Sequence, residues 1–342
     1  MPKKSLSAKS LPKTYLLHQC ALYKVESKRR LAKVLGLEFP ALVRLSKDEE
    51  NFNVFEIPEE LCAFTNKKTK ARWVQNPIPE LKAIHRRIQI LLSRVIVPEY
   101  CHGGIKGKSY RSNAATHVKS PVIATFDLKS FFPSTTSKQV FGFFRHDMLC
   151  TPDVAGLLTD LCTYQRILPT GSPVSPILAF WANRSLFATL NKRAEDQNLK
   201  LSVYVDDITM SGNALPESLA TQVDGIVQKY GHKLSLGKTK HFGPDAAKHV
   251  TGVVIHRGIL KVPNSRFKKA RAISHAIMNA TDDATKEGLT AKLAGLLGEA
   301  AFIDKSYKAW AERTYAALAS LRLIGQQASA LSDYATPYRL PH

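Results

Sequence analysis

The sequence predicts an α+β protein, in which a mixed block of roughly 250 residues is followed by a helical segment. Short apolar runs typical of strands alternate with amphipathic stretches of helical spacing as far as residue 263. From Ser265 to about residue 325 only helical spacing is found, with Leu289, Leu293 and Trp310 on one face. The 342 residues suffice for two or three subdomains and a substantial core.

The charge of the chain predicts a polyanionic partner. Hydrophobic residues make up 44% and charged residues 23%, as is usual for a globular protein in solution. The balance of charge is unusual, because 49 Lys and Arg face 28 Asp and Glu, for a net charge of +21. A nucleic acid is the first partner to expect and an anionic membrane surface the second.

The cysteines and the apolar stretches predict a soluble cytoplasmic protein without a membrane partner. The five cysteines are scattered, and no pair has the spacing of a zinc site, so reduced thiols are expected. No apolar stretch approaches 18 residues, and YLLHQCALY near the start is too short and too polar for a signal peptide.

The first elements follow from caps and periodicity. Residues 1–14, rich in Lys, Ser and Pro, are expected to form a loose basic arm. The stretch SKRRLAKVLG is typical of a short helix with Ser27 as N-cap and Gly36 as C-cap. Apolar residues at helical spacing predict an amphipathic helix with a basic outer face over 79–96. Two strands are expected here, at 51–58 and, after a basic turn, within 65–77.

The later elements alternate in the same way. A glycine-rich basic stretch, HGGIKGKSYRSNAATH (102–117), precedes the apolar strand PVIATFD (121–127). Helices are expected at about 137–163, from LPTGSPVSP (168–176) to about 197, and at about 216–230. Hairpins are expected at 203–211 and 249–263.

The hairpin VYVDDITMSG carries two adjacent carboxylates, Asp206 and Asp207, at its expected tip. Two-residue hairpin turns favour glycine-containing pairs, and neighbouring like charges repel each other. A third carboxylate, Asp127, ends the apolar strand 121–127, and strand ends are where site residues leave a sheet. If this strand lies beside the hairpin, three carboxylates converge, and a cation is needed to neutralise them.

Magnesium suits such a cluster, because it is a hard ion that takes oxygen ligands from carboxylates and substrate phosphates. Two such ions stabilise the attacking and leaving oxygens of a phosphoryl displacement. In the alternative, Asp206 and Asp207 form a solvated turn and Asp127 caps a helix. That alternative is disfavoured, because the two features occur together in a protein of this charge.

Four stretches in order, FDLKSFF, LPTGSPVSP, VYVDDITMSG and GHKLSLGKTK, resemble the motifs of reverse transcriptases. NAATH (113–117) and VTG (250–252) resemble two further elements of retron reverse transcriptases, and SKRRLAKVLG and RAISH fit the flanks of that family. The resemblance, from about residue 22 to 320, implies a right-hand polymerase fold, with an antiparallel sheet in fingers and palm and a helical thumb. The implied domains are a basic arm at 1–21, fingers with an N-terminal helix at 22–120, a palm at 121–263 with a fingers segment within about 137–170, and a thumb at 264–342.

The resemblance also implies roles for single residues. Asp127, Asp206 and Asp207 match the catalytic metal-binding triad, joined by the backbone of Leu128. Lys238 matches the lysine that approaches the triphosphate and protonates the leaving pyrophosphate. Phe132 would clash with a ribose 2′-OH and so select deoxynucleotides, while one ring of the pair Phe131–Phe132 is expected in the core. The implied nucleotide-binding residues are Lys70, Arg72, Phe132, Thr170 and Gly171, with Lys67 and Lys68 as weaker candidates beside them.

The sequence departs from the family pattern at three positions without losing a metal ligand. Thr170 stands where glutamine is usual, so rate or fidelity is expected to differ. Val205 replaces a common alanine, and Ser235 a frequent asparagine.

Nucleic-acid contacts are expected along much of the chain. Basic residues surround the NAATH element and begin the helical segment, so that binding should weaken steeply with salt. His117 could equally be a structural histidine, and the VTG element could equally belong to a primer-grip hairpin. The predicted RNA-binding residues are Asn113, His117, Val250, Thr251, Gly252, Arg266, Lys268, Lys269 and Arg271.

The resemblance implies an RNA-directed DNA polymerase that uses dNTPs and Mg²⁺, with Mn²⁺ as a substitute. It would copy part of a cognate noncoding RNA into a small branched DNA linked to RNA, in a cytoplasmic anti-phage retron with an effector protein encoded nearby. Alternatives are a reverse transcriptase of a mobile intron or of a diversity-generating element, and a ribonucleoprotein scaffold that holds RNA and an effector. Only about twenty residues follow the expected thumb helices, which disfavours an intron enzyme with a maturase extension. Phe132 disfavours an RNA-synthesising enzyme.

Overall fold

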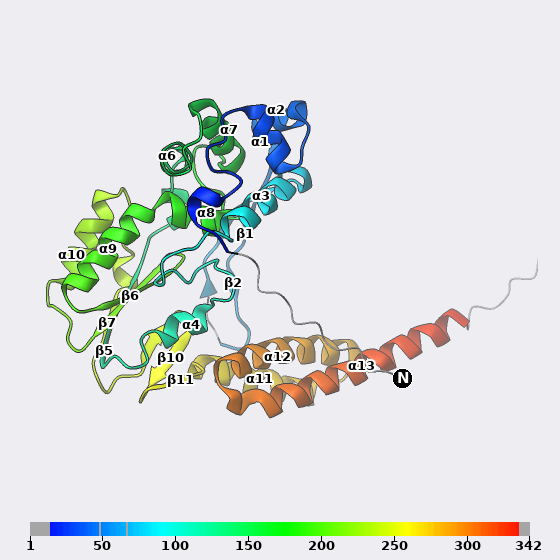
Figure 1. Ribbon diagram of the computed structural model, residues 1–342. Coiled ribbons are helices and arrows are strands. Elements are labelled where there is room, and N and C mark those ends of the chain that lie inside the picture. Colours follow the sequence, from blue (N-terminus) through cyan, green and yellow to red (C-terminus); the bar gives the residue numbers. More distant parts are fainter. Residues whose placement is uncertain (1–13, 48, 66–67, 335–342) are drawn as a thin grey trace, which may run out of the picture. The chain divides into compact units, whose positions relative to one another are not determined.

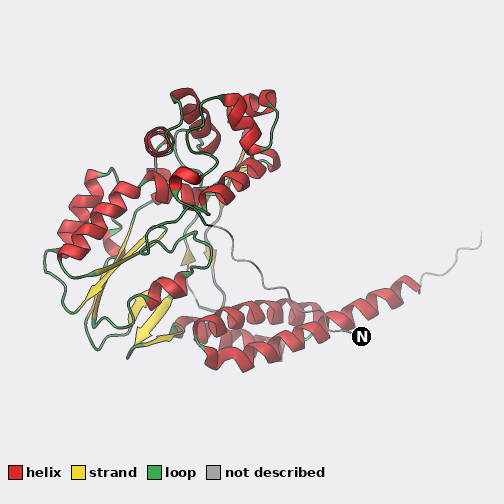
Figure 2. Ribbon diagram, viewed as in Figure 1, coloured by secondary structure: helices red, strands yellow, loops and turns green. Residues whose placement is uncertain are grey.

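The computed structural model describes residues 14–47, 49–65 and 68–334. The chain divides into two compact units. Unit 1 comprises Met1–Pro58 and Ala71–Ala246, and unit 2 comprises Glu59–Lys70 and Ala247–His342. Figure 2 shows helices together with strands, and the neighbouring strands pair antiparallel, which agrees with the predicted α+β class. The expected basic arm lies outside the described residues up to residue 13.

Unit 1 combines helices with a four-stranded sheet and a separate strand pair. Its helices are α1 (Lys28–Leu35), α2 (Phe39–Lys47), α3 (Pro79–Leu92), α4 (Tyr110–Ala115), α5 (Phe131–Ser134), α6 (Ser137–Gly142), α7 (Pro152–Cys162), α8 (Ser175–Ala182), α9 (Arg184–Asp196) and α10 (Leu219–Lys229). Its strands are β1 (Phe52–Ile57), β4 (Arg72–Pro77), β5 (Val122–Asp127), β6 (Lys200–Tyr204), β7 (Asp207–Gly212) and β8 (Lys240–Phe242).

The four-stranded sheet of unit 1 has the order β6-β7-β5-β8, with antiparallel neighbours throughout. Along β7, Ile208 and Met210 are buried on one face, and Thr209 and Ser211 are buried on the other. A strand buried on both faces needs cover on each of them. Helix α9 packs against β6, α10 packs against α9, and α4 also contacts β6 (Figure 1).

Helix α1 forms as its sequence predicts. The Ser27 hydroxyl accepts a hydrogen bond from the Arg30 N–H, which satisfies one free donor of the first turn. The helix ends at Gly36, which adopts the left-handed conformation with φ of 77°. The predicted strands at 51–58 and within 65–77 form β1 and β4, which pair with each other.

Three expected helices are shorter than predicted. The segment expected at 137–163 is interrupted after α6 by a π-helical turn and by Leu149 with φ of 53°, before Pro152 begins α7. The helix expected up to 197 divides at Asn183, whose side chain donates to the Ala179 carbonyl and the Thr135 hydroxyl. Helix α3 ends at Leu92, and the chain beyond it pairs with Tyr15.

In its described residues, unit 2 contains a three-stranded sheet, three helices and a short strand pair. The strands are β2 (Glu60–Leu61), β3 (Lys68–Thr69), β9 (Lys248–Val250), β10 (Val253–His256) and β11 (Ile259–Lys261), and the helices are α11 (Asn264–Asn279), α12 (Asp283–Ile303) and α13 (Lys308–Tyr334). The expected hairpin at 249–263 thus has three strands, in the order β11-β10-β9. Ala270, Ile273, Leu293, Leu297 and Ala311 form a common core of the helices, and Phe64 packs against it.

The cysteines form no disulfide bonds, as predicted for reduced thiols. All five cysteines are free; four are buried and Cys62 is half-buried. No helix in the described part of the chain combines the length and the apolar character that crossing a bilayer requires.

Candidate active site

The sheet confirms the prediction that the strand ending at Asp127 lies beside the hairpin that carries Asp206 and Asp207. Strands β5 and β7 pair so that Asp127, the last residue of β5, lies opposite Asp207, the first residue of β7. Asp206 precedes β7 in the turn that follows β6. The Leu128 N–H donates to the Asp206 carbonyl at 2.9 Å, which fixes the turn to the end of β5. The pairing brings the three aspartates to the same end of the sheet.

The turn differs in one respect from the predicted hairpin tip. Its two residues are Val205 and Asp206, because Asp207 already belongs to β7. The positive φ that such a turn requires falls on Val205, at 60°. This conformation is strained for a β-branched residue, and strain of this kind is concentrated at functional sites.

The segment before α4 supports this turn. The His102 N–H donates to the Val203 carbonyl at 2.8 Å, and the Val203 N–H donates to the Tyr100 carbonyl at 2.8 Å. Gly103 follows, and a Cβ atom at this position would lie 2.3 Å from the Val205 nitrogen. Only glycine therefore allows this close approach of two backbones.

The carboxylates perturb one another. Burial, with Asp206 and Asp127 nearby, raises the pKa of Asp207 to about 7. Burial, with the Asp127 charge nearby, also raises the pKa of Asp206. The Lys238 ammonium donates to Asp127 Oδ2 at 2.7 Å, and this hydrogen bond and the nearby carboxylates raise the pKa of Lys238. Lys238 is thus a cation within reach of the cluster.

The donor chemistry of the cluster suits a hard divalent cation, because all of its ligands are carboxylate oxygens whose like charges need neutralising. Among the described residues, however, no three His, Cys, Asp or Glu side chains are arranged closely enough to hold one metal ion. The Lys238 ammonium directly contacts Asp127, and the Lys238 side chain is 66% exposed.

The two phenylalanines after the first aspartate occupy different environments. Phe131 is buried and contacts Phe187 and His232, so this ring belongs to the core. Phe132 is half-buried and packs at the edge of the same core. Phe132 therefore keeps accessible surface, and its predicted contact with the sugar stays a prediction.

The loop that contains Thr170 and Gly171 docks on β4. The Thr170 N–H and hydroxyl both donate to Gln75 Oε1, at 3.1 Å each, and the Gly171 N–H donates to the Gln75 carbonyl at 3.2 Å. A Cβ atom on Gly171 would lie 2.6 Å from that carbonyl oxygen. The structure thus joins the predicted nucleotide-binding loop to the strand that begins with Arg72.

The other predicted nucleotide-binding cations are placed as follows. Arg72 is exposed at the start of β4 in unit 1, and Lys70 is exposed in unit 2. Lys68 forms an ion pair with Glu59 at 2.8 Å. Lys67 lies outside the described residues.

Buried histidines support the motif loops, and the sequence alone did not indicate this. His85 contacts the Ser172 hydroxyl and the Leu161 carbonyl, at 2.7 Å each, and burial lowers its pKa to about 4. His232 contacts the Ser134 hydroxyl at 2.8 Å and Asn183 Oδ1 at 2.7 Å. A single sequence gives no signal for such pairs, because their partners are distant along the chain.

The predicted RNA-binding residues are split between the units. In unit 1, Asn113 is buried, and His117 is buried between the hydroxyls of Ser202 and Ser211, at 2.7 Å each. This geometry supports the structural alternative for His117, and its contact with RNA stays a prediction.

In unit 2, Val250 is buried, while Thr251 and Gly252 form the turn between β9 and β10 with positive φ. On α11, Arg266 forms an ion pair with Glu299 at 3.2 Å. The remaining predicted residues of α11 differ in exposure: Lys268 and Arg271 are exposed, and Lys269 is half-buried.

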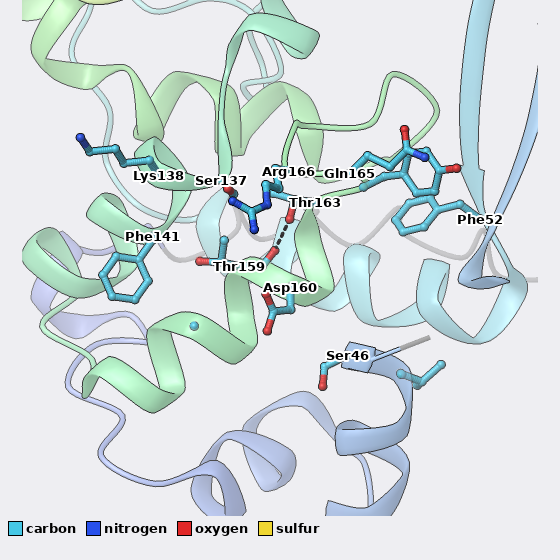
Figure 3. Close-up of a pocket in the computed structure, with 13 residues that line it drawn as sticks. Ser46, Phe52, Ser137, Lys138, Phe141, Thr159, Asp160, Thr163, Gln165 and Arg166 are labelled. Atoms are coloured by element: carbon cyan, nitrogen blue, oxygen red, sulfur yellow. Dashed lines mark hydrogen bonds between the residues drawn. The ribbon is translucent and has the colours of Figure 1, made fainter. Parts of the chain in front are cut away.

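Unit 1 also contains a cavity of about 520 Å³ among α2, α6 and α7 (Figure 3). Asp160 and Arg166 line it, and in Figure 3 the Lys138 side chain points away from them. Burial raises the pKa of Asp160. The residues that line this cavity include none of the predicted site residues, so we assign it no part in the chemistry.

Comparison with known proteins identifies the family. Residues 64–255, more than half of the chain, match the family model described as reverse transcriptase (RNA-dependent DNA polymerase). The chain therefore belongs to the reverse transcriptase family, whose class of enzyme is the one predicted from the motifs.

Similar individual proteins are retron reverse transcriptases. The retron Ec86 reverse transcriptase of Escherichia coli is 29% identical over 211 residues, which cover 61% of this chain and 66% of that protein. The retron Se72 reverse transcriptase of Salmonella heidelberg (strain 579083-10) is 29% identical over 257 residues, which cover 72% of this chain and 66% of that protein. The retron Mx65 reverse transcriptase of Myxococcus xanthus is 28% identical over 262 residues, 71% of this chain and 60% of that protein.

The chain thus spans slightly less than two thirds of the length of these relatives. They confirm the predicted resemblance to reverse transcriptases of the retron type.

Proposed function

We propose that the chain is an RNA-directed DNA polymerase that copies part of a cognate structured noncoding RNA into a small DNA linked to that RNA. The observation that carries the proposal is the pairing of Asp127 with Asp207 across β5 and β7, with Asp206 in the adjoining turn. The membership of the reverse transcriptase family and the retron relatives support the same function.

In this proposal Asp127, Asp206 and Asp207, with the backbone of Leu128, would hold two Mg²⁺ ions, or Mn²⁺ in their place. The ions would stabilise the charge on the attacking and leaving oxygens of nucleotidyl transfer. The raised pKa of Asp207 supports this assignment, because a buried cluster of like charges favours the binding of a cation.

Other residues of the chain have proposed roles in handling the nucleotide. Lys238, protonated and close to the carboxylates, would give a proton to the leaving pyrophosphate. The accessible part of the Phe132 ring would clash with a ribose 2′-OH and so exclude ribonucleotides. The residues proposed to bind the incoming dNTP are Lys70, Arg72, Thr170 and Gly171.

The finer assignments follow the retron resemblance. The proposed fingers and palm lie at 22–120 and 121–263, and the proposed thumb at 264–342. The NAATH and VTG elements and the basic residues of α11 would bind the cognate RNA and the RNA–DNA hybrid product. The proposed setting is a cytoplasmic anti-phage retron with an effector protein encoded nearby.

The carboxylates are tested by Asp206→Asn and Asp207→Asn in primer extension on an RNA template. We expect DNA synthesis to fall by at least about 1,000-fold, because each change removes a charged oxygen ligand. RNA binding is expected to stay within about twofold, since the basic surfaces are unchanged. Glu217→Gln, at an exposed acidic residue, is the matched control. Normal DNA yield from either carboxylate variant would contradict the assignment.

The retron type is tested on protein purified after expression with its flanking genomic segment. Nucleic acid extracted from it is treated with RNase or DNase. A small DNA joined covalently to RNA, absent from the Asp207→Asn preparation, is expected. If the protein were active only on an added primer–template, it would be a polymerase but not one of the retron type. If no RNA-linked DNA were found and no added primer were extended, the alternative of a scaffold that holds RNA would be favoured.

A further inference from the structure

Two helices of unit 2 contribute aromatic and cationic side chains to one cavity of about 400 Å³. On α11 the lining residues follow helical spacing and share one face of the helix. On α13 two residues three positions apart complete the lining. The cavity is lined by Phe267, Arg271, Ser274 and His275 from α11 and by Trp310 and Arg313 from α13.

The aromatic side of this cavity, called here the α11–α13 cavity, is built around Trp310. The Trp310 ring stacks with Tyr307, with centroids 6.5 Å apart and planes at 18°. Phe267 meets Trp310 edge-on at 6.5 Å, and it meets Tyr307 in the same way at 6.4 Å. Trp310 also packs against the helical core of unit 2 and is half-buried. The indole is therefore held in place while part of it stays accessible.

The cationic side carries charge that the protein does not neutralise. Arg271 and Arg313 are exposed, and neither arginine forms an ion pair with any residue that the structure describes. The acidic neighbour of Arg313, Glu312, is paired with Lys308 at 3.6 Å. Helix α11 itself contains no Asp or Glu. The two guanidinium groups thus remain available to an anionic ligand.

These features define the chemistry of the ligand. A guanidinium group binds a phosphate through two parallel hydrogen bonds, and an accessible indole face stacks on a nucleobase. A volume of about 400 Å³ is at the small end of ligand sites, which suits one nucleotide and excludes a double helix. A paired base is covered by its neighbours in the stack, so the base that enters must be unpaired.

We propose that the α11–α13 cavity binds a single unpaired nucleotide of an RNA chain, with its base against Trp310 and its phosphate on Arg271 and Arg313. The inference rests on the proposed function for its choice of RNA. A nucleotide within a chain fits better than a free one, because exposed Lys268 continues the positive charge along α11 beyond the cavity. Flanking phosphates of the same RNA would neutralise that charge.

The experiment uses the full chain and a short RNA hairpin whose loop carries one 2-aminopurine. Stacking of this base on an indole changes its fluorescence, which reports both affinity and contact. Trp310→Leu is expected to weaken binding by about 10- to 100-fold, because it removes base stacking. Arg313→Gln is expected to weaken binding by about tenfold, because it removes a charged hydrogen bond to phosphate.

Matched controls separate the cavity from the rest of unit 2. Tyr315→Leu removes an exposed aromatic ring from the same helix, and Lys292→Gln removes an exposed charge from α12. Both are expected to bind the hairpin within about twofold of the parent chain. Trp310→Phe keeps an aromatic ring and is expected to restore most of the binding, which distinguishes stacking from a folding defect in Trp310→Leu.

An abasic loop nucleotide provides the matched ligand. Measured by competition against the 2-aminopurine hairpin, the abasic hairpin is expected to bind the parent chain and Trp310→Leu with equal affinity. A loss of equal size for the intact and abasic hairpins, or no loss for either, would overturn the proposal. Competition by a polyglutamate peptide as strong as that by unlabelled RNA would overturn it too, since the cavity would then recognise negative charge alone.

The same preparations are assayed for extension of a fully paired primer on a linear RNA template. Extension by Trp310→Leu at the parent rate, with weakened hairpin binding, supports the cavity and the polymerase. If the parent chain bound the hairpin through Trp310 but extended no primer, the proposed function would fail and the nucleotide cavity would stand.

Discussion

Val205 is the residue on which the position of the carboxylates depends most directly. A β-branched residue with φ of 60° carries strain of about 1–3 kcal/mol, which the surrounding structure must offset. The backbone bonds of Tyr100 and His102 to Val203, and the close approach of Gly103, hold this turn. The turn therefore depends on a segment some hundred residues earlier in the chain.

Gly103→Ala is expected to lower DNA synthesis by about 100-fold or more, because its Cβ would displace the backbone of Val205 and with it Asp206. Primer extension under saturating substrate measures the effect. The control is Gly225→Ala in α10, where an added Cβ meets no atom within 4 Å, and where alanine should stabilise the helix by about 0.5–1 kcal/mol. Full activity of Gly103→Ala would show that the turn tolerates displacement.

Lys238→Gln is expected to reduce the rate of synthesis by about 100-fold, since the proposed proton donor is lost. Its side chain is largely exposed, so the ion pair with Asp127 adds little stability, and the melting temperature should change by less than about 3 °C. Measurements of kcat and of thermal melting test both points. Lys238→Arg keeps the charge but binds its proton too tightly to donate it. Full rescue by arginine would limit the role of Lys238 to charge.

For single residues, the sequence predicted the features that depend on neighbours along the chain. Asp206 and Asp207 are adjacent, and Asp127 ends a recognisable strand, so their convergence could be inferred. The contacts of Gln75 with Thr170 and of His85 with Ser172 could not be inferred, because only the folded chain brings these residues together. The positive φ on Val205 was also missed, since turn preferences favour glycine there.

At the scale of elements, hydrogen bonds of His117 connect α4 to the four-stranded sheet. His117 follows the helix and contacts Ser202 of β6 and Ser211 of β7. Burial, with the charges of His102 and Lys200 nearby, lowers the pKa of His117 to about 3. The imidazole is therefore neutral in the folded protein and can donate to one serine and accept from the other.

The contribution of His117 to stability depends on pH. In the unfolded chain its pKa is about 6.5, so between pH 6.5 and 3 the unfolded state binds a proton that the native state does not. The free energy of unfolding is thus expected to fall as pH decreases below 6.5, by up to about 1.4 kcal/mol per pH unit from this group.

Urea unfolding between pH 7 and 4.5 measures this slope. His117→Asn is expected to give a shallower slope than the parent chain, whatever its absolute stability. Asp207 acts in the opposite direction, because its pKa is raised, but it is present in both proteins. His275→Asn, at an exposed ring, is the control. Equal slopes for His117→Asn and the parent chain would contradict the buried neutral imidazole.

Elements with strong local signals were predicted well. Helix α1 has its cap residues at both ends, and β5 and β7 are short apolar runs. The division of the expected helix at Asn183 was missed, because the bond from its side chain to Thr135 is a tertiary contact. The third strand of the 249–263 segment, β11, is too short to show a period of two.

At the scale of the whole molecule, the net charge of +21 should dominate RNA binding. The logarithm of the binding constant is expected to fall linearly with the logarithm of salt concentration. Replacing Lys268 and Arg271 with glutamine should reduce this slope by about 1.5, if each contacts one phosphate. RNA-binding titrations at about 50 to 500 mM NaCl, where the binding constant depends steeply on salt, measure this slope.

The control for this slope replaces Lys192 and Lys229, exposed residues of α9 and α10, with glutamine. An equal change of slope in both double variants would mean that RNA responds to total charge and not to α11.

The chain passes between its two units three times, and this sets an order on folding during synthesis. Phe64 leaves the ribosome early, but Ala270 and Ile273, the first residues of the core against which it packs, follow roughly 200 residues later. At about 5–20 residues per second, Phe64 waits roughly 10–40 s for them. Unit 1 can assemble much of its sheet in that time. The segment Glu59–Lys70 meanwhile lacks the helical core of unit 2 against which Phe64 packs. A fragment that begins at Ala247 would lack this loop permanently, so unit 2 should mature last and only as part of the longer chain.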